Sequence, residues 1–97
     1  MTRTQHEQLL SCRDYVLAAL RHEMIYRGND LSWVNRERLT VAIASNQWAR
    51  ANGFADDVTV DDVERIEGSA VGHVDYGRKL AFYMAERVMR PSPRRND

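Results

Sequence analysis

The 97-residue sequence has few of the residues and motifs that usually identify a catalytic or binding site. Its one cysteine, Cys12, excludes an internal disulfide framework. It has no glycine-rich phosphate loop, and none of its serines lies in a nucleophile-elbow motif. No apolar run approaches the roughly 18 residues that a membrane span needs. These absences argue against disulfide scaffolds, phosphate-loop enzymes, serine hydrolases and membrane-spanning proteins.

The first seven residues are polar, and no apolar segment of a signal peptide follows them. A lone cysteine is also typical of a reducing compartment. We therefore expect a cytoplasmic protein in which Cys12, lying in an apolar helical pattern, packs in the core.

Two His-Glu pairs, at His6 and His22, begin like the helix of a zinc protease. The second histidine of that motif is replaced by Leu10 and Tyr26, respectively. His6 and His22 themselves lie about 160° apart around one predicted helix, so they cannot share an ion there. We therefore expect no metal and no other cofactor.

The charges balance overall but are separated in the second half of the chain. The formal net charge is zero, which weakens long-range attraction to nucleic acid or an anionic membrane. Residues 54–75 carry seven acids and one base, whereas residues 76–97 carry six bases and two acids. Thirteen of the fourteen bases are arginine, whose planar fork suits carboxylates and phosphates.

The hydrophobic pattern predicts an all-α fold, a compact single-domain bundle of about four helices with short loops. A first helix is predicted over 4–27, ending before Gly28, with an apolar stripe formed by Leu9, Cys12, Val16, Leu20 and Met24. A second helix, capped by Asp30, Ser32 or Asn35, is predicted to reach about Asn52. Its buried face stays open between two sets: Leu39, Ala42, Ile43, Gln47 and Leu39, Val41, Ala44, Trp48.

The third helix is predicted to begin after Thr59 as its N-cap, with Asp61 and Asp62 complementing the helix dipole. Gly68 is expected to end or loosen it, although Ala70 and Val71 could continue it. The side chains expected to point inward are Val60, Val63 and Ile66. The fourth helix is predicted over 76–90, with Asp75 as its cap and Pro91 as its stop. The domain then covers 1–90, followed by a disordered polar tail over 91–97.

The fourth helix is apolar on nearly all sides, which is typical of a helix at the centre of a bundle. One of its sides, containing Phe82 and Met89, could instead form a homodimer or partner surface. If it packs antiparallel to the third helix, the acidic start of one meets the basic end of the other, and part of the charge separation closes as intramolecular pairs.

DNA binding is one alternative function. The third and fourth helices could form a helix-turn-helix, with Arg78 and Lys79 in the major groove and Arg94 and Arg95 adding weak contacts. Three residues argue against it, because apolar packing is expected at Glu67, His73 and Arg78. A small helical enzyme is a further alternative, with an anionic substrate held by Arg13, Arg21, Arg38 and Arg78.

Binding to a protein partner is the function that the pattern favours. Trp, Tyr and Arg dominate interface energetics, and the chain has many of them. Trp33 and Tyr76, at predicted helix starts, are expected to be exposed, whereas Trp48 and Phe82 are expected in the core. The acids expected to contact a basic surface of the partner are Asp56, Asp57, Asp61, Asp62, Glu64 and Glu67.

The first hypothesis is therefore a non-enzymatic protein that regulates or inhibits a larger macromolecular partner. A short, arginine-rich, charge-segregated helical chain without catalytic residues resembles small accessory proteins of bacteria and their phages. Anti-CRISPR proteins are one such group, and the resemblance implies an inhibitor encoded by a phage or mobile element.

Overall fold

The computed structural model describes residues 2–26 and 33–90, with side chains for 2–22 and 35–90. Within these residues the chain forms four α-helices and no strand: α1 (Arg3–Tyr26), α2 (Trp33–Ala51), α3 (Val60–Ala70) and α4 (Tyr76–Met89). The predicted all-α bundle is confirmed. Several predictions concern residues outside the described ones: the stops at Gly28 and Pro91, the caps Asp30 and Ser32, the Met24 side chain, and the tail over 91–97.

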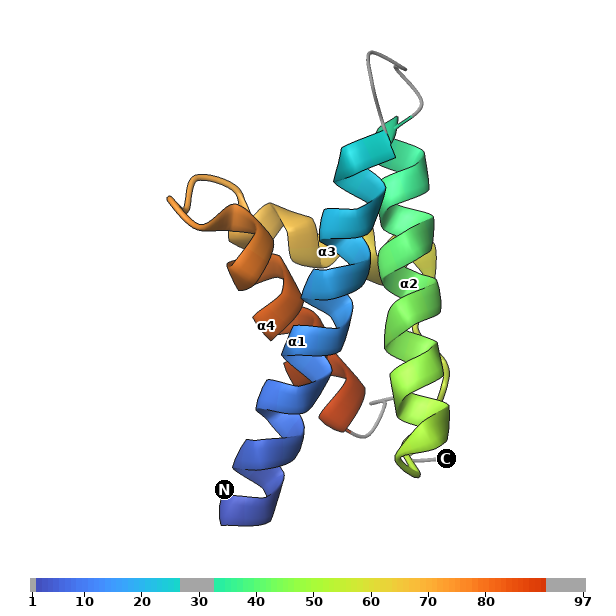
Figure 1. Cartoon of the computed structure of the whole chain (residues 1–97), viewed down its shortest axis with the longest axis vertical. Coiled ribbons are helices and arrows are strands. Elements are labelled where there is room, and N and C mark those ends of the chain that lie inside the picture. The colour runs from blue at the N-terminus through green and yellow to red at the C-terminus, as the bar shows by residue number, and fades with distance from the viewer. Residues whose placement is uncertain (1, 27–32, 91–97) are drawn as a thin grey trace.

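Helices α1 and α2 run antiparallel and side by side, and α3 and α4 lie behind them in the view of Figure 1. Two side-chain hydrogen bonds join the pair. Trp48 Nε1 donates to Ser11 Oγ over 3.2 Å, and Tyr15 Oη donates to Gln47 Oε1 over 3.1 Å. Trp48 is also stacked on Phe54, with ring centroids 5.5 Å apart, so it lies in the core as expected.

The buried stripe of α1 is the predicted one, including Leu9, Cys12, Val16 and Leu20. Helix α2 resolves the choice that the sequence left open. Its buried face contains Val41, Ala42, Ala44, Ser45, Trp48 and Ala49. Leu39, which both predicted sets contained, and Ile43, from the first set, are exposed, so the prediction was wrong for these two residues.

Helix α4 packs against each of the other three helices, as α2 also does, so these two helices lie at the centre of the bundle. It runs antiparallel to α1: Gly77 in its first turn faces Leu17 and Leu20, and Met89 at its end lies near Leu9. Its buried residues are Leu80, Ala81, Met84, Ala85 and Val88. Phe82 is only half-buried, so it is less covered than the sequence predicts.

Helix α3 begins with a complete capping box at the predicted residue. Thr59 Oγ1 accepts a hydrogen bond from the Asp62 N–H over 3.1 Å, and Asp62 Oδ2 accepts one from the Thr59 N–H over 3.0 Å. Val58 and Val63 are both buried, as a hydrophobic staple across this turn requires. Local capping chemistry therefore fixes where this helix starts.

Three local predictions need correction. Val60 does not point inward; it is 38% exposed, because the buried face of α3 passes through Val63, Glu67 and Ala70. Gly68 does not end α3, which continues to Ala70. Asp75 holds the N-cap position of α4, but its carboxylate makes no capping hydrogen bond and pairs with Arg78 over 3.3 Å.

Candidate functional site

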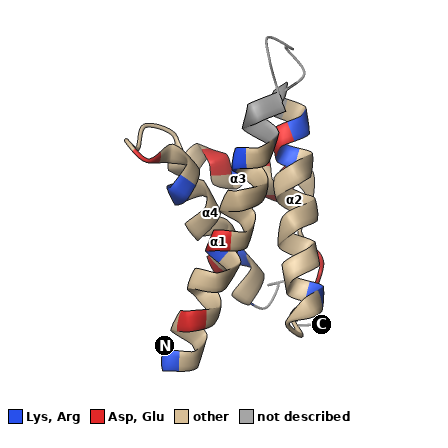
Figure 2. Cartoon of the chain, viewed as in Figure 1, with Lys and Arg blue, Asp and Glu red and all other residues tan. Residues whose placement is uncertain are grey.

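Most acids of residues 54–75, which we call the acidic segment, form ion pairs with arginines of the same chain. Figure 2 shows how acidic and basic residues are distributed over the helices. One guanidinium nitrogen of Arg87, near the end of α4, lies 3.2 Å from Asp57 Oδ1 and 3.2 Å from Asp62 Oδ2. Asp62 also lies 2.7 Å from Arg65. The acidic start of α3 therefore meets the basic end of α4, as expected for antiparallel packing. Asp57 and Asp62 are structural residues here as well as predicted contact residues.

The remaining acids of the segment differ in how available they are. Asp56 pairs with Arg50 over 2.9 Å on the surface. Glu64 is 61% exposed and lies 3.9 Å from Arg38, which is a loose ion pair. Asp61 is exposed and has no ion-pair partner among the described residues. Asp61 and Glu64 are therefore the acids most available to a partner.

Glu67 does not belong to the exposed acidic surface, which corrects the sequence interpretation. Its residue is 7% exposed, and its Oε1 accepts a hydrogen bond from Arg38 Nε over 2.7 Å. Glu37 of α2 is buried beside it, at 3% exposure. The Tyr76 hydroxyl, at the start of α4, lies 3.4 Å from one oxygen of each carboxyl group. These residues join three helices in one buried polar cluster, which we call the carboxyl cluster: Glu37, Arg38, Glu67 and Tyr76.

Burial shapes the protonation of the carboxyl cluster. The pKa of Glu37 is raised to about 7, first by burial and then by the hydrogen bond and charge of Glu67, whereas Tyr76 and Arg38 act in the opposite direction. Burial, together with the two glutamates, also raises the pKa of Tyr76, so its hydroxyl stays neutral. The hydrogen bond to Glu67 raises the pKa of Arg38. The cluster thus contains one cation, one neutral hydroxyl and two carboxyl groups.

The sequence analysis missed Glu37, although a signal for it exists. Glu37 lies four residues before Val41 and continues the buried stripe of α2 through Ser45. Glu67 lies four residues after Val63 and three before Ala70, so it continues the buried stripe of α3. Two acids on the apolar stripes of two adjacent helices would have indicated a buried pair.

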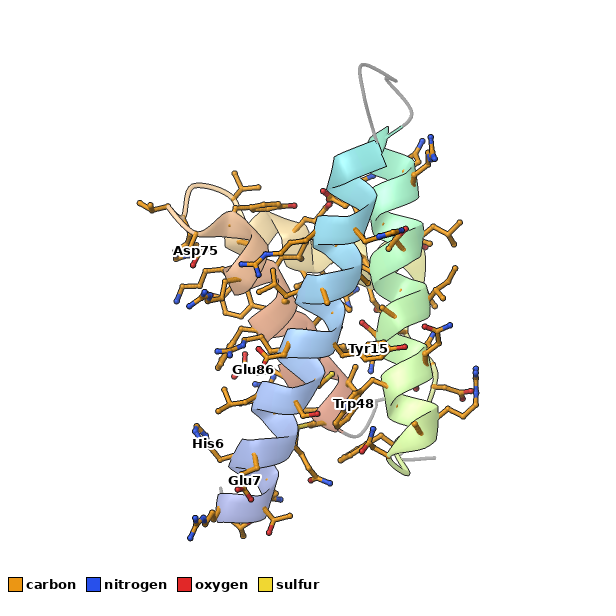
Figure 3. The ribbon with its side chains drawn as sticks, viewed as in Figure 1. His6, Glu7, Tyr15, Trp48, Asp75 and Glu86 are labelled. Carbon is orange, nitrogen blue, oxygen red and sulfur yellow. The ribbon has the colours of Figure 1, made fainter. Side chains whose placement is uncertain are left out.

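Tyr76 is half-buried because its hydroxyl points into the carboxyl cluster, so it is not the exposed aromatic that its position suggested. Trp33 begins α2, but its side chain lies outside the described part of the chain. Among the described aromatic residues, Tyr15 is the exposed one, at 45%, and it points from α1 toward α2 (Figure 3).

Two exposed aliphatic side chains lie one turn apart on α2. Leu39 is 51% exposed and Ile43, one turn later, is 47% exposed. The ion pair of Arg38 with Glu64 joins α2 to α3, and two 2.9 Å hydrogen bonds join Asn46 of α2 to Val58, just before α3. Val60, the first residue of α3, is 38% exposed. We define the α2–α3 face as these exposed residues together with the two available acids: Leu39, Ile43, Val60, Asp61 and Glu64.

A cavity of about 210 Å³ lies where α1 meets the start of α4, and its lining contains Arg13, Asp75, Arg78, Lys79 and Phe82. Arg13 pairs with Asp14 over 2.7 Å and Arg78 with Asp75 over 3.3 Å. Lys79 is exposed and makes no ion pair with a described residue. The two residues of the DNA-binding alternative thus meet at one basic cavity, whereas Arg94 and Arg95 lie outside the described residues.

The helix-turn-helix and enzyme alternatives can be placed on the same geometry. Glu67 is buried, as the helix-turn-helix alignment requires at its position, but His73 and Arg78 are exposed. Of the four arginines considered for an enzyme, Arg13 and Arg78 share the basic cavity, Arg38 belongs to the carboxyl cluster, and Arg21 is exposed on α1.

A second cavity of about 270 Å³ lies further along the α1–α4 seam and is lined by Gln5, Leu9, Glu86, Met89 and Arg90. Figure 3 labels one lining residue of each cavity: Asp75, just before α4, lines the first, and Glu86, near the end of α4, lines the second. The candidate dimer residues Phe82 and Met89 therefore border cavities at the seam.

Cys12 is fully buried, and burial raises the pKa of its thiol to about 12, so it packs as an apolar residue. Within the described residues, no three His, Cys, Asp or Glu side chains are arranged to hold a metal ion. None of the helices described is long and apolar enough to cross a membrane.

Comparison with known proteins gives no relative: no family model matches the chain, and neither characterised proteins nor solved structures include a significant match.

Proposed function

We propose that this chain is a small non-enzymatic protein-binding module that regulates or inhibits a larger macromolecular partner through the α2–α3 face. The observation that carries the proposal is the exposure of Leu39 and Ile43, each about half open to solvent on one side of α2. Exposed aliphatic groups at helical spacing on α2, together with the exposed acids Asp61 and Glu64 of α3, would give an interface with an apolar centre and a charged edge. This is the usual anatomy of a protein interface.

The face also indicates the chemistry of the partner. Asp61 and Glu64 would meet Arg or Lys side chains at the edge, while Leu39, Ile43 and Val60 pack against an apolar spot. A basic partner surface of this kind is common where a protein otherwise binds nucleic acid. An inhibitor encoded by a phage or mobile element, of the anti-CRISPR kind, is the form of this function that the size and charge pattern favour.

Site-specific photo-crosslinking tests the proposal inside the native host. A photoreactive amino acid replaces Ile43 in one variant and Val74, in the loop between α3 and α4, in another. Val74 is fully exposed but lies outside the α2–α3 face, so it is the matched control. We expect a discrete crosslinked protein at Ile43 and none at Val74. The same pattern at both positions, or no product at Ile43, would contradict the proposal.

The partner identified by the crosslink is then purified, and its affinity for variants of this chain is measured. Leu39→Ser with Ile43→Ser should weaken binding at least about tenfold, because two aliphatic anchors are lost. Adding Asp61→Asn and Glu64→Gln to that variant should weaken partner binding further and reduce the dependence of the affinity on salt. Asp57 and Asp62 are left intact, since they hold Arg87 and their loss would also change stability. Val74→Ser should bind like the wild type.

The basic cavity supports a second candidate, a DNA-binding regulator that dimerises through α4. Its lining brings Arg13, Arg78 and Lys79 around the half-exposed ring of Phe82. Fluorescence anisotropy with labelled duplex DNA at two salt concentrations tests it. Binding that weakens with salt and is lost in Arg78→Gln with Lys79→Gln would support this candidate, and no binding at low salt would remove it. A small helical enzyme with an anionic substrate in the same cavity is the third proposal.

A further inference from the structure

The carboxyl cluster places two acids in the interior of a small protein, each from a different helix. Glu37 comes from α2 and Glu67 from α3, and they are 3% and 7% exposed. Tyr76, at the start of α4, reaches both carboxyl groups with one hydroxyl, 3.4 Å from each. The titratable groups of the cluster therefore lie at the contact of these three helices.

The cluster does not contain enough positive charge for both acids to be ionised. Arg38 is its one cation, and it binds Glu67 over 2.7 Å while also lying 3.9 Å from Glu64. Tyr76 has a single proton for two acceptors. If both acids were ionised, Glu37 would be a buried carboxylate beside a second carboxylate and without a cation of its own. A buried charge in that position is strongly unfavourable.

A single additional proton resolves this conflict. Protonated Glu37 becomes a donor and can bond to the carboxylate of Glu67, which lies within hydrogen-bonding reach. Glu67 keeps its negative charge opposite Arg38, and Tyr76 completes the set. Every polar group of the cluster is then used, which is the condition under which a buried polar network stabilises a fold.

We propose that Glu37 and Glu67 form a proton-dependent latch that holds α2, α3 and α4 together when one proton is shared between the two carboxyl groups and weakens their contact when that proton is lost. The groups facing Glu37 are Arg38 on its own helix, Glu67 on α3 and Tyr76 on α4. No α1 group is among those that shift the Glu37 pKa.

The direction of the pH dependence follows from the pKa of Glu37. Its ordinary value is 4.5, and burial together with the neighbouring Glu67 raises it to about 7 in the folded chain. Between these values the folded chain holds a proton that the unfolded chain releases. The contribution of Glu37 to stability is therefore fully present below about pH 4.5, declines as the pH rises toward 7, and is absent above that.

The latch also reaches the surface. Arg38 connects Glu67 in the cluster with Glu64 on the α2–α3 face. Loss of the proton would therefore loosen the contact between α3 and α2, the two helices that carry this face. An effect on partner binding would follow, and that effect rests on the proposed function. The latch itself is a property of the isolated chain. Its test needs no partner, so its failure would leave the proposed function untouched.

Urea unfolding of the purified chain between pH 5 and pH 8 tests the latch. Glu37→Gln keeps the shape and a hydrogen-bond donor but removes the titration. We expect the unfolding equilibrium constant of the wild type to rise on the order of a hundredfold over this range and that of Glu37→Gln to lack this rise. Glu7→Gln, at an exposed position on α1, controls for the loss of one acid. The same pH dependence in the wild type and Glu37→Gln would overturn the proposal.

A direct titration keeps the proposal testable if Glu37→Gln does not fold. The side-chain carboxyl carbon of Glu37 is followed by NMR in the wild-type chain from pH 4 to pH 9. A titration midpoint near 7, together with faster amide exchange in α3 above it after correction for the intrinsic pH effect, supports the latch. A midpoint near the ordinary value of 4.5 excludes it.

Discussion

The buried side chain of Ser45 lowers the stability of the hydrophobic core. The residue is fully buried on α2, and its Oγ has no hydrogen-bond partner among the described residues. A buried hydroxyl without a partner keeps its desolvation cost. Its neighbours along the stripe, Val41 and Trp48, are apolar and equally covered.

We therefore expect Ser45→Ala to stabilise the protein by about 1 kcal/mol, because it removes the unpaired hydroxyl and also favours the helix. Urea unfolding at pH 6 measures the change. Ser69→Ala, at an exposed position on α3, is the control that separates helix propensity from burial. An equal gain in both variants would show that the hydroxyl of Ser45 has no special cost.

At the scale of helices, Gly68 is the residue of α3 with the lowest helix propensity. It lies inside the helix with an ordinary backbone conformation, and nothing lies within 4 Å of the position that a Cβ would take. Gly68→Ala should therefore stabilise the protein by about 0.5–1 kcal/mol through helix propensity. Thermal unfolding checks this expectation. Gly72→Ala should be destabilising instead, since Gly72 has a φ of +94°.

Helix boundaries were predictable wherever a local chemical signal sets them. Thr59 with Asp62 has the sequence of a cap and forms one, and Gly53 follows α2 with a φ of +81°. Gly68 misled the prediction because packing of Val63, Glu67 and Ala70 holds the helix together despite its low propensity. The predicted orientation of Val60 was wrong because the buried stripe of α3 includes the acid Glu67. A pattern of hydrophobic residues alone assigns an acid to the surface.

The candidate site was less predictable than the helices, for a related reason. The acidic segment is visible in the sequence, but the arginines that neutralise it come from α2 and α4 and meet it only through tertiary packing. Exposure of Leu39 and Ile43 likewise depends on which side of α2 the other helices cover. Such features follow from helix packing, which a single sequence constrains weakly.

At the scale of the whole molecule, the pairing of Arg87 with Asp57 and Asp62 connects the last helix to the α2–α3 connection. Burial alone would raise the pKa of Asp62, but the Thr59 N–H together with the Arg65 and Arg87 charges outweighs it, so the pKa lies below its usual range. A lowered pKa contributes stability that is present above about pH 4 and lost as the pH falls.

Arg87→Gln should lower the free energy of unfolding at pH 6 by about 1–2 kcal/mol, because the two partly buried carboxylates lose a cation. The difference from the wild type should shrink below pH 4 as the carboxylates become protonated. Urea unfolding at pH 6 and pH 3 measures both effects. Arg90→Gln, one turn along at an exposed position, should change neither value. An equal loss at both pH values would indicate that Arg87 acts through packing alone.

The central position of α4 also has a consequence for synthesis of the chain. Because α4 packs against α1, α2 and α3, the parts of their apolar faces that it covers stay open until residue 89 has left the ribosome. The hairpin of α1 and α2 therefore emerges with Leu17 and Leu20, which face Gly77 of α4, open to water. The nascent chain is most prone to aggregate in that interval, and a chaperone that binds apolar helices would act on it then.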